Sequence, residues 1–434
     1  MKKVRMLLKI TMLLLVIFLF STPLWSGEKK VRIELFWHMT EYEDWAREVM
    51  APLFEKKNPD IDLFWTFVND PENETVMAAR LAAGNPPDLF ILSGEPAFTA
   101  VEEDMLVDLS QIPEIQENLS HYPPSAFEFP RRIREKAGLE PKGIYGVPAE
   151  TVLMGIFYDK NRWGELGVSP VATWDEWWKL LDKLESSGKF IHAMYWGNHR
   201  AMIKIHFWEA ANSLVGHDVG PGIVSGKYKL DGPEMMQVYD WFVRMVNNYA
   251  DKDYLSLEWG LQEAKFANWK YALCAQGPWV FISYPKINPE VELRAFPWPT
   301  KDGKNRAWYS FLDMRNWWMS KKYPKGSSQW KAQVRVLNWI IGPEYADHMI
   351  EDVGILSMYK KEYKISAPIL EYMWNQDFPL VNHWDNTCSL YIPSGQMSFN
   401  AFVWENLPKL TSGEMSSKEF GKYLEDWYAS FRPK

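Results

Sequence analysis

Cysteine is nearly absent from this chain. Cys274 and Cys388 are the two cysteines among 434 residues, so the sequence excludes a disulfide-rich scaffold and a metal cluster built from thiolates. Cys274 lies inside a short apolar run, where a thiol behaves as a small buried apolar group. We therefore expect two buried free thiols, with a single Cys274–Cys388 bridge as the alternative.

Long apolar runs, an excess of one charge and known catalytic motifs are also missing. After residue 20 no apolar run approaches the length of a membrane span. The net charge is −8, with acidic and basic residues interspersed, which argues against a nucleic-acid or anionic-membrane partner. We find no nucleophile-elbow, zinc-binding or phosphate-loop motif, and so we expect no metal, no cofactor and no catalytic residues.

The N-terminus has the form of a secretory signal. Basic residues precede the apolar stretch ITMLLLVIFLF (10–20), and Ser26-Gly27 offers a small-residue cleavage point. We predict a signal peptide over residues 1–26, with an uncleaved membrane anchor as the alternative. No cysteine follows the stretch that could carry a lipid, so the protein is not expected to be a lipoprotein. An exported soluble protein stays near its cell if an outer barrier retains it, which points to the periplasm.

Strands and helices alternate at the start of the mature chain. VRIELFW (31–37) and IDLFWTF (61–67) alternate as strands, and DLFILS (88–93) has the pattern of a buried strand. Apolar residues at helical spacing predict a helix at 45–54 and another at 73–84. This order of elements is typical of a mostly parallel sheet with helices on both faces.

The rest of the chain repeats these two patterns. Two capping boxes, Thr173-x-x-Glu176 and Ser416-x-x-Glu419, mark helix starts. Further strands are expected within 143–159 (two segments) and at 190–196, 271–275, 291–299 and 308–320, and further helices at 173–185, 202–216, 233–248, 328–342 and 416–431. A chain of this length is too long for one core, and no flexible linker is visible. We therefore expect an α/β protein of two lobes, with the chain passing between them along strands or short segments.

Tryptophan is abundant, and one tryptophan has an unusual setting. The chain has 24, more than packing alone needs, and the flat indole face suits a sugar ring. In FANWKYALCAQGPWVF (266–281), residues 271–275 are expected to form a buried strand, and Pro278 cannot donate to a sheet. Trp279 therefore lies at or beyond a strand end, where α/β sheets commonly bind ligands. Taken alone, packing against the core is the simpler explanation.

Taken in order, several stretches resemble the extracellular solute-binding proteins of sugar ABC transporters, the maltose-binding-protein-like group (family 1). They cover nearly the whole mature chain: LFWHMTEYEDW, GNPPDLFILSGEP, YGVPAETVLMGIFYDKNRW, TWDEWWKLLDKL, ALCAQGPWVF, IPSGQMSF and SGEMSSKEFG. The resemblance implies the periplasmic-binding-protein fold, two α/β lobes with several hinge crossings and a ligand cleft between them. We expect lobes of 30–150 with 295–343 and of 151–294 with 344–434.

The same resemblance implies a function. The protein would bind a carbohydrate, expected to be an oligosaccharide, and deliver it to the membrane permease of an ABC transporter, without enzymatic activity. We expect it to act as a monomer.

The resemblance also implies which residues contact the ligand. Trp279 matches the stacking tryptophan, while Glu41, Glu95 and Glu150 are acids that could accept hydrogen bonds from sugar hydroxyls. The other candidates are His38, Trp196, Asn198, His199, Arg315, Asn316 and Phe399. Arg315 and Asn316 interrupt an apolar strand, and a buried cation needs a partner; the family often has small residues there. The alternatives are solvated loop charges or helix N-terminal acids for the glutamates, and core packing for His38 and Phe399.

Two other functions remain open at the level of the sequence. A glycoside hydrolase needs two carboxylates about 5–10 Å apart, a separation that sequence does not measure. A binding protein for a cationic small molecule, such as a polyamine, would also use acids and aromatic rings. Cleavage products from oligosaccharides would identify the first, and calorimetric titration against both ligand classes would identify the second.

Overall fold

The computed structural model describes residues 30–69, 72–92, 95–128, 131, 134–135, 137–150, 153–195, 200–251, 254, 259–310, 315–359, 373, 380–382, 390, 392 and 396–432. The predicted signal peptide, Cys388 and the candidates Trp196, Asn198 and His199 lie outside these residues. Among the helices of the described ranges, none is both long and apolar enough to cross a membrane.

The first sheet has five strands in the order β2-β1-β3-β10-β4. Its strands are β1 (Val31–Trp37), β2 (Ile61–Phe67), β3 (Leu89–Leu92), β4 (Gly146–Pro148) and β10 (Asn316–Met319). β1 runs parallel to β2 and β3, while β10 runs antiparallel to both β3 and β4. Two antiparallel steps restore direction, so β1, β2, β3 and β4 all end at one edge of the sheet.

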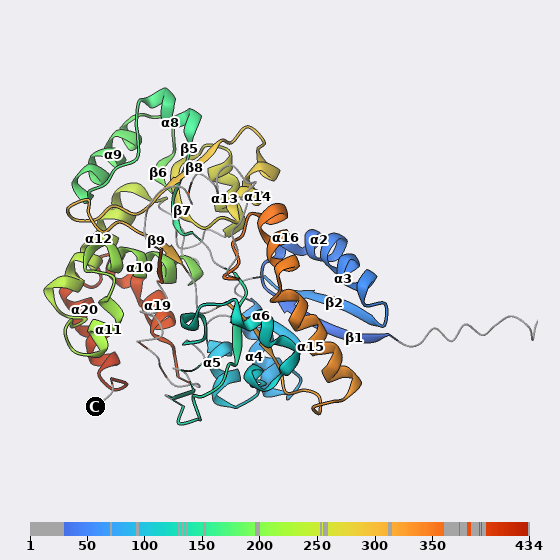
Figure 1. Ribbon diagram of the computed structural model, residues 1–434. Coiled ribbons are helices and arrows are strands. Elements are labelled where there is room, and N and C mark those ends of the chain that lie inside the picture. The colour runs from blue at the N-terminus through green and yellow to red at the C-terminus, as the bar shows by residue number, and fades with distance from the viewer. Residues whose placement is uncertain are drawn as a thin grey trace, which may run out of the picture.

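Helices from distant parts of the chain cover this sheet. They are α2 (Glu43–Trp45), α3 (Ala51–Lys57), α4 (Glu72–Ala82), α5 (Glu95–Glu102), α6 (Gln116–Ser120), α15 (Ser328–Ile340) and α16 (Pro343–Val353). In Figure 1 the orange α15 and α16 lie beside the blue N-terminal elements. Trp45 and Tyr345 join the two sets, because their rings meet with centroids 5.9 Å apart.

The second sheet has four strands in the order β6-β7-β5-β8. They are β5 (Gly155–Asp159), β6 (His192–Met194), β7 (Tyr271–Gln276) and β8 (Leu293–Phe296). Here β5 is the antiparallel strand, so β6, β7 and β8 end at the edge where β5 begins. Its helices are α8 (Lys160–Leu166), α9 (Trp174–Ser186), α10 (Arg200–Leu214), α11 (Val219–Val224), α12 (Pro233–Tyr249), α13 (Trp259–Ala267), α14 (Val280–Ile287), α19 (Phe399–Thr411) and α20 (Ser417–Tyr428).

Local sequence signals account for several of these boundaries. The Thr173 hydroxyl accepts from the Glu176 backbone N–H at 3.3 Å, and the Glu176 carboxylate accepts from the Thr173 backbone N–H at 3.0 Å. The same reciprocal bonds between Ser416 and Glu419 begin α20. Both predicted capping boxes are therefore confirmed, and each satisfies backbone donors that a helix start leaves open.

One predicted strand is wrong. Residues 308–320 were expected to form a single strand, but β9 (Trp308–Ser310) pairs with β11 (Leu380–Asn382), whereas β10 belongs to the first sheet. Trp308 and Trp317 are only 2% and 1% exposed. Because both strands are buried on both faces, the sequence shows no polar alternation to mark the change of sheet.

Two of the crossings between the sheets lie mostly within the described residues, and backbone bonds tie these two together. Residues 149–154 lead from β4 to β5, and residues 297–315 lead from β8 through β9 to β10. The Ala149 N–H donates to the Arg315 carbonyl at 2.7 Å. Met154 and Tyr309 exchange two such bonds, at 2.7 and 3.3 Å. The lobes are therefore joined by paired extended segments, while the lobe boundaries given above stay a prediction.

Tryptophan packing is dense in both lobes. In the first, Trp37, Trp65 and Trp317 have ring centroids 6.0 to 6.2 Å apart. In the second, Trp174 and Trp298 are 6.0 Å apart in a cluster with Trp177 and Trp241. Packing explains these residues, so tryptophan content is weaker support for sugar binding than the composition suggested.

Candidate functional site

The ends of the first sheet's strands bring several predicted residues to one edge. His38 follows β1, Glu95 begins the helix after β3, and Glu150 follows β4. Asn316 begins β10 opposite both Leu92 and Pro148, so it lies at the same edge. We call this region the strand-end edge. Ligands of α/β sheets commonly bind beyond the carboxyl ends of the strands.

A buried ion pair lies at the strand-end edge. The Arg315 guanidinium donates from Nη1 to the Glu150 carboxylate and contacts Met39 Sδ at 3.5 Å. The Glu150 side chain is 1% exposed and that of Arg315 is 12% exposed. Among the described residues, nothing donates to the second Glu150 oxygen, Oε2. The partner that a buried arginine requires is therefore Glu150, which comes from the other crossing segment.

Burial and the charged groups of this edge shift the pKa of the Tyr42 hydroxyl. Tyr42 is fully buried. Burial raises its pKa well above the usual range, the Glu41 and Glu150 carboxylates raise it further, and the Arg315 guanidinium opposes them. The hydroxyl therefore stays neutral near pH 7. His38, which is close to Tyr42 in the sequence, is 3% exposed. Asn316, at the same edge of the sheet, is 0% exposed.

Trp279 approaches from the second lobe. It lies in the turn between β7 and α14, beyond the strand end as the Gly-Pro step predicts. Its indole N–H donates to Gln276 Oε1 at 2.9 Å, and the Arg315 guanidinium carbon lies 5.7 Å from the ring centroid. The side chain is 4% exposed. The structure thus joins Trp279, Arg315 and Glu150 into one contact chain across the two lobes.

The remaining predicted residue lies elsewhere. Phe399 begins α19 and is 3% exposed. Its ring packs on Phe207 and Trp208, with centroids 5.8 and 5.6 Å apart. These are the contacts of a core residue in the second lobe.

Sequence reasoning did not single out four residues of this network. Met39 and Tyr42 lie within the motif that contains His38 and Glu41. Gln276 ends β7, and Gly277 begins the turn that contains Trp279. The signal that could have found all four is proximity along the chain to a predicted site residue. Tyr42, Gln276 and Gly277 add a polar or unusually small side chain near a strand end.

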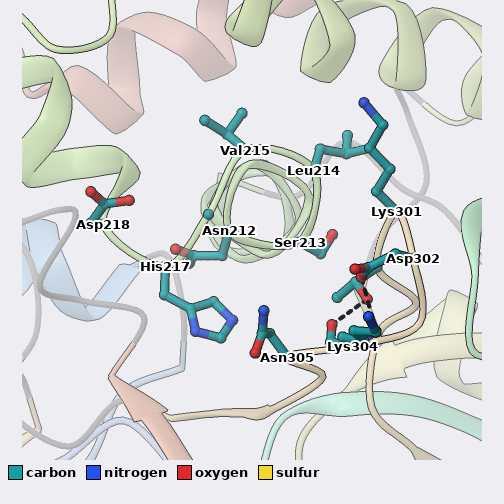
Figure 2. A pocket seen from close by; sticks show the side chains of 12 residues that line it. Asn212, Ser213, Leu214, Val215, His217, Asp218, Lys301, Asp302, Lys304 and Asn305 are labelled. Atoms are coloured by element: carbon teal, nitrogen blue, oxygen red, sulfur yellow. Dashed lines mark hydrogen bonds between the residues drawn. The ribbon is translucent and has the colours of Figure 1, made fainter.

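A second feature is a pocket of 770 Å³ at the C-terminal end of α10 (Figure 2). It is formed by the C-terminal end of α10, the residues that follow it, and the segment 300–305. Asn212, His217 and Asn305 are among the lining side chains labelled in Figure 2. Burial lowers the pKa of His217, with Asp218 opposing, so its imidazole is neutral near pH 7. The described lining includes none of the predicted site residues.

The described residues contain no group of three or more histidine, cysteine, aspartate or glutamate side chains that could hold a metal ion. The polar side chains of the strand-end edge can form hydrogen bonds with a ligand, and the ring of Trp279 can contact it.

Comparison with known proteins adds sequence relatives and a shared fold. A multiple sugar-binding protein of Streptococcus mutans is 24% identical over 294 residues, which span 64% of this chain and 65% of that protein, just under two thirds of its length. The melibiose/raffinose/stachyose-binding protein MelE of Bacillus subtilis is 22% identical over 373 residues, 82% of this chain and 80% of that one.

A solved chitin oligosaccharide binding protein matches with a TM-score of 0.74 at 17% identity, covering 92% of this chain and 98% of that chain. The fold is therefore the two-lobed α/β fold that these proteins share. A family model for the bacterial extracellular solute-binding proteins matches residues 50–370. Because this match covers most of the chain, the protein belongs to the bacterial extracellular solute-binding protein family.

Proposed function

We propose that this protein binds a carbohydrate, most simply an oligosaccharide, between its two lobes and delivers it to the permease of an ABC importer. Relatives named for binding sugars support the ligand class. The observation that carries the proposal is the strand-end edge, where Trp279 of one lobe meets the Glu150–Arg315 pair of the other. An indole ring is one kind of contact that a sugar needs, and polar side chains at the same edge, such as Asn316, are the other.

Titration calorimetry against a panel of sugars tests this function. The panel is raffinose, stachyose, maltose and a chitin oligosaccharide, with spermidine as a cationic comparison. We expect at least one sugar to bind and spermidine to give no heat of binding. Binding of spermidine alone would replace the carbohydrate by a polyamine. Cleavage products after long incubation would show a glycoside hydrolase instead of a binding protein.

Closure of the lobes would link binding to transport. A ligand that contacts both lobes binds the closed form better and shifts the population toward it. Small-angle scattering with and without the bound sugar measures this, and the radius of gyration should fall on binding. An unchanged profile with sugar bound would mean that the protein does not close. Limited proteolysis followed by mass spectrometry would test the predicted lobe boundaries.

Export completes the proposal. The signal peptide over residues 1–26 would be removed, leaving a periplasmic monomer without a lipid. Mass spectrometry of the protein isolated from its native host gives the N-terminus and any lipid, and light scattering gives the oligomeric state. A mass that retains residues 1–26 would favour an uncleaved anchor.

A further inference from the structure

Trp279 is held first by its own turn. Its indole N–H donates to Gln276 Oε1 at 2.9 Å. Gly277 packs so closely against the ring that a Cβ there would lie 2.2 Å from Trp279 Cζ3. These two contacts come from the second lobe and fix one edge and one side of the indole.

Arg315 contacts the same ring from the first lobe, but it does not cover it. Its guanidinium carbon is 5.7 Å from the Trp279 centroid, near the outer limit of a cation–π contact. Arg244 over Trp178 shows the distance of a stacked guanidinium in this protein, 3.9 Å. Arg315 therefore flanks the indole.

Contacts of its backbone and side chain also restrain the position of Arg315. Its backbone carbonyl accepts from Ala149, its Nη1 donates to Glu150, and the same atom contacts Met39 Sδ. If the guanidinium moved away, the Glu150 carboxylate, which is 1% exposed, would remain as a buried charge without its counter-ion. The contact with Trp279 is thus made by a group that the crossing segments hold in position.

We infer that Arg315 is a positioning residue, which sets the orientation of Trp279 for the ligand rather than binding the ligand itself. Glu150 is its counter-ion and fixes it in turn. The orientation of the stacking tryptophan would then depend on both crossings as well as on its own turn. This inference rests on the proposed carbohydrate function, because it assumes that a sugar contacts Trp279.

A double-mutant cycle on affinity tests the inference. The double variant E150Q/R315M removes the ion pair without leaving a buried charge, and it is made in the wild-type and the W279F backgrounds. The probe is the tightest-binding sugar of the panel, measured by calorimetry. R244M is the matched control, because it removes a guanidinium from a tryptophan that is outside this network.

If Arg315 acts through Trp279, E150Q/R315M weakens binding by about fivefold or more in the wild type and by less than about twofold in W279F. R244M should leave affinity unchanged. Equal losses in both backgrounds would overturn the inference, because the pair would then act independently of Trp279. Tighter binding by E150Q/R315M would also overturn it, since Arg315 would then compete with the sugar for the ring.

A measurement without ligand separates this inference from the proposed function. The protein is labelled with 5-fluorotryptophan, and the Trp279 fluorine signal is assigned by its loss in W279F. E150Q/R315M should shift or broaden that signal while most of the other tryptophan signals stay in place. An unchanged Trp279 signal would refute the positioning role. If the wild type binds no panel sugar but the signal moves, the carbohydrate function fails and the positioning of Trp279 stands.

Discussion

Replacing Gly277 with alanine gives the most direct test of how the Trp279 turn is built. An added Cβ would lie 2.2 Å from Cζ3, 2.5 Å from Cη2 and 2.7 Å from Cε3 of the indole. The ring would have to move by more than an ordinary packing adjustment, and its 2.9 Å bond to Gln276 would be strained or lost. Overpacking costs about 1–3 kcal/mol, and a lost hydrogen bond costs about 1 kcal/mol. We therefore expect the free energy of unfolding to fall by about 2–4 kcal/mol.

The measurement is equilibrium unfolding in urea, followed by far-ultraviolet circular dichroism. The control is Gly260→Ala in α13, where an added Cβ meets nothing within 4 Å. Alanine in a helix is favoured over glycine, so this control should leave the midpoint unchanged or raise it slightly. Sugar binding by Gly277→Ala should weaken because the ring is displaced. If Gly277→Ala unfolds at the wild-type midpoint, the close approach of backbone and indole would be wrong.

Three further predictions follow from burial. Trp279→Ala should lower the free energy of unfolding by about 3–5 kcal/mol and weaken sugar binding by about 2 kcal/mol, measured by urea unfolding and calorimetry; unchanged affinity with lost stability would leave only a packing role. Glu150→Gln should lower the free energy of unfolding by about 3–5 kcal/mol because it removes the buried carboxylate that pairs with Arg315, and E150Q/R315M should recover most of the loss; equal stability of the two variants would contradict this. In a Cys388→Ser variant, the Cys274 thiol, whose pKa burial raises despite its hydrogen bond to a tyrosine, should react with a thiol reagent after unfolding but not before; fast labelling of this variant in its folded state would refute the burial of Cys274.

Much of the fold was predictable because its elements are long and regular. The alternation in β1 and β2 and the apolar stripe of α12 are set by local spacing, which the sequence displays directly. The direction of a strand relative to its neighbours is not set by local spacing. Whether β10 runs parallel or antiparallel depends on how the crossings bring it back, and the residues of a fully buried strand are the same in either case. The split between β9 and β10 was missed for the same reason.

The site was predictable in outline but not in its connections. The rule that ligands lie beyond strand ends singled out Trp279, the family resemblance added Glu150, and a buried arginine was expected to need a partner. The identity of that partner was not visible, because Glu150 and Arg315 are 165 residues apart. The contact between Arg315 and Trp279 likewise depends on how the two lobes are placed, which no local pattern encodes.

The ties between the two crossings are made by backbone groups, from Ala149 to Arg315 and between Met154 and Tyr309. Every residue except proline carries the same donor and acceptor in its main chain. Substitutions in these segments can therefore accumulate over evolutionary time without changing the axis about which the lobes would turn. Side chains around the ligand are then free to diverge while the segments that join the lobes keep their geometry. Because lobe movement and ligand recognition would depend on different groups, one architecture would serve many different solutes.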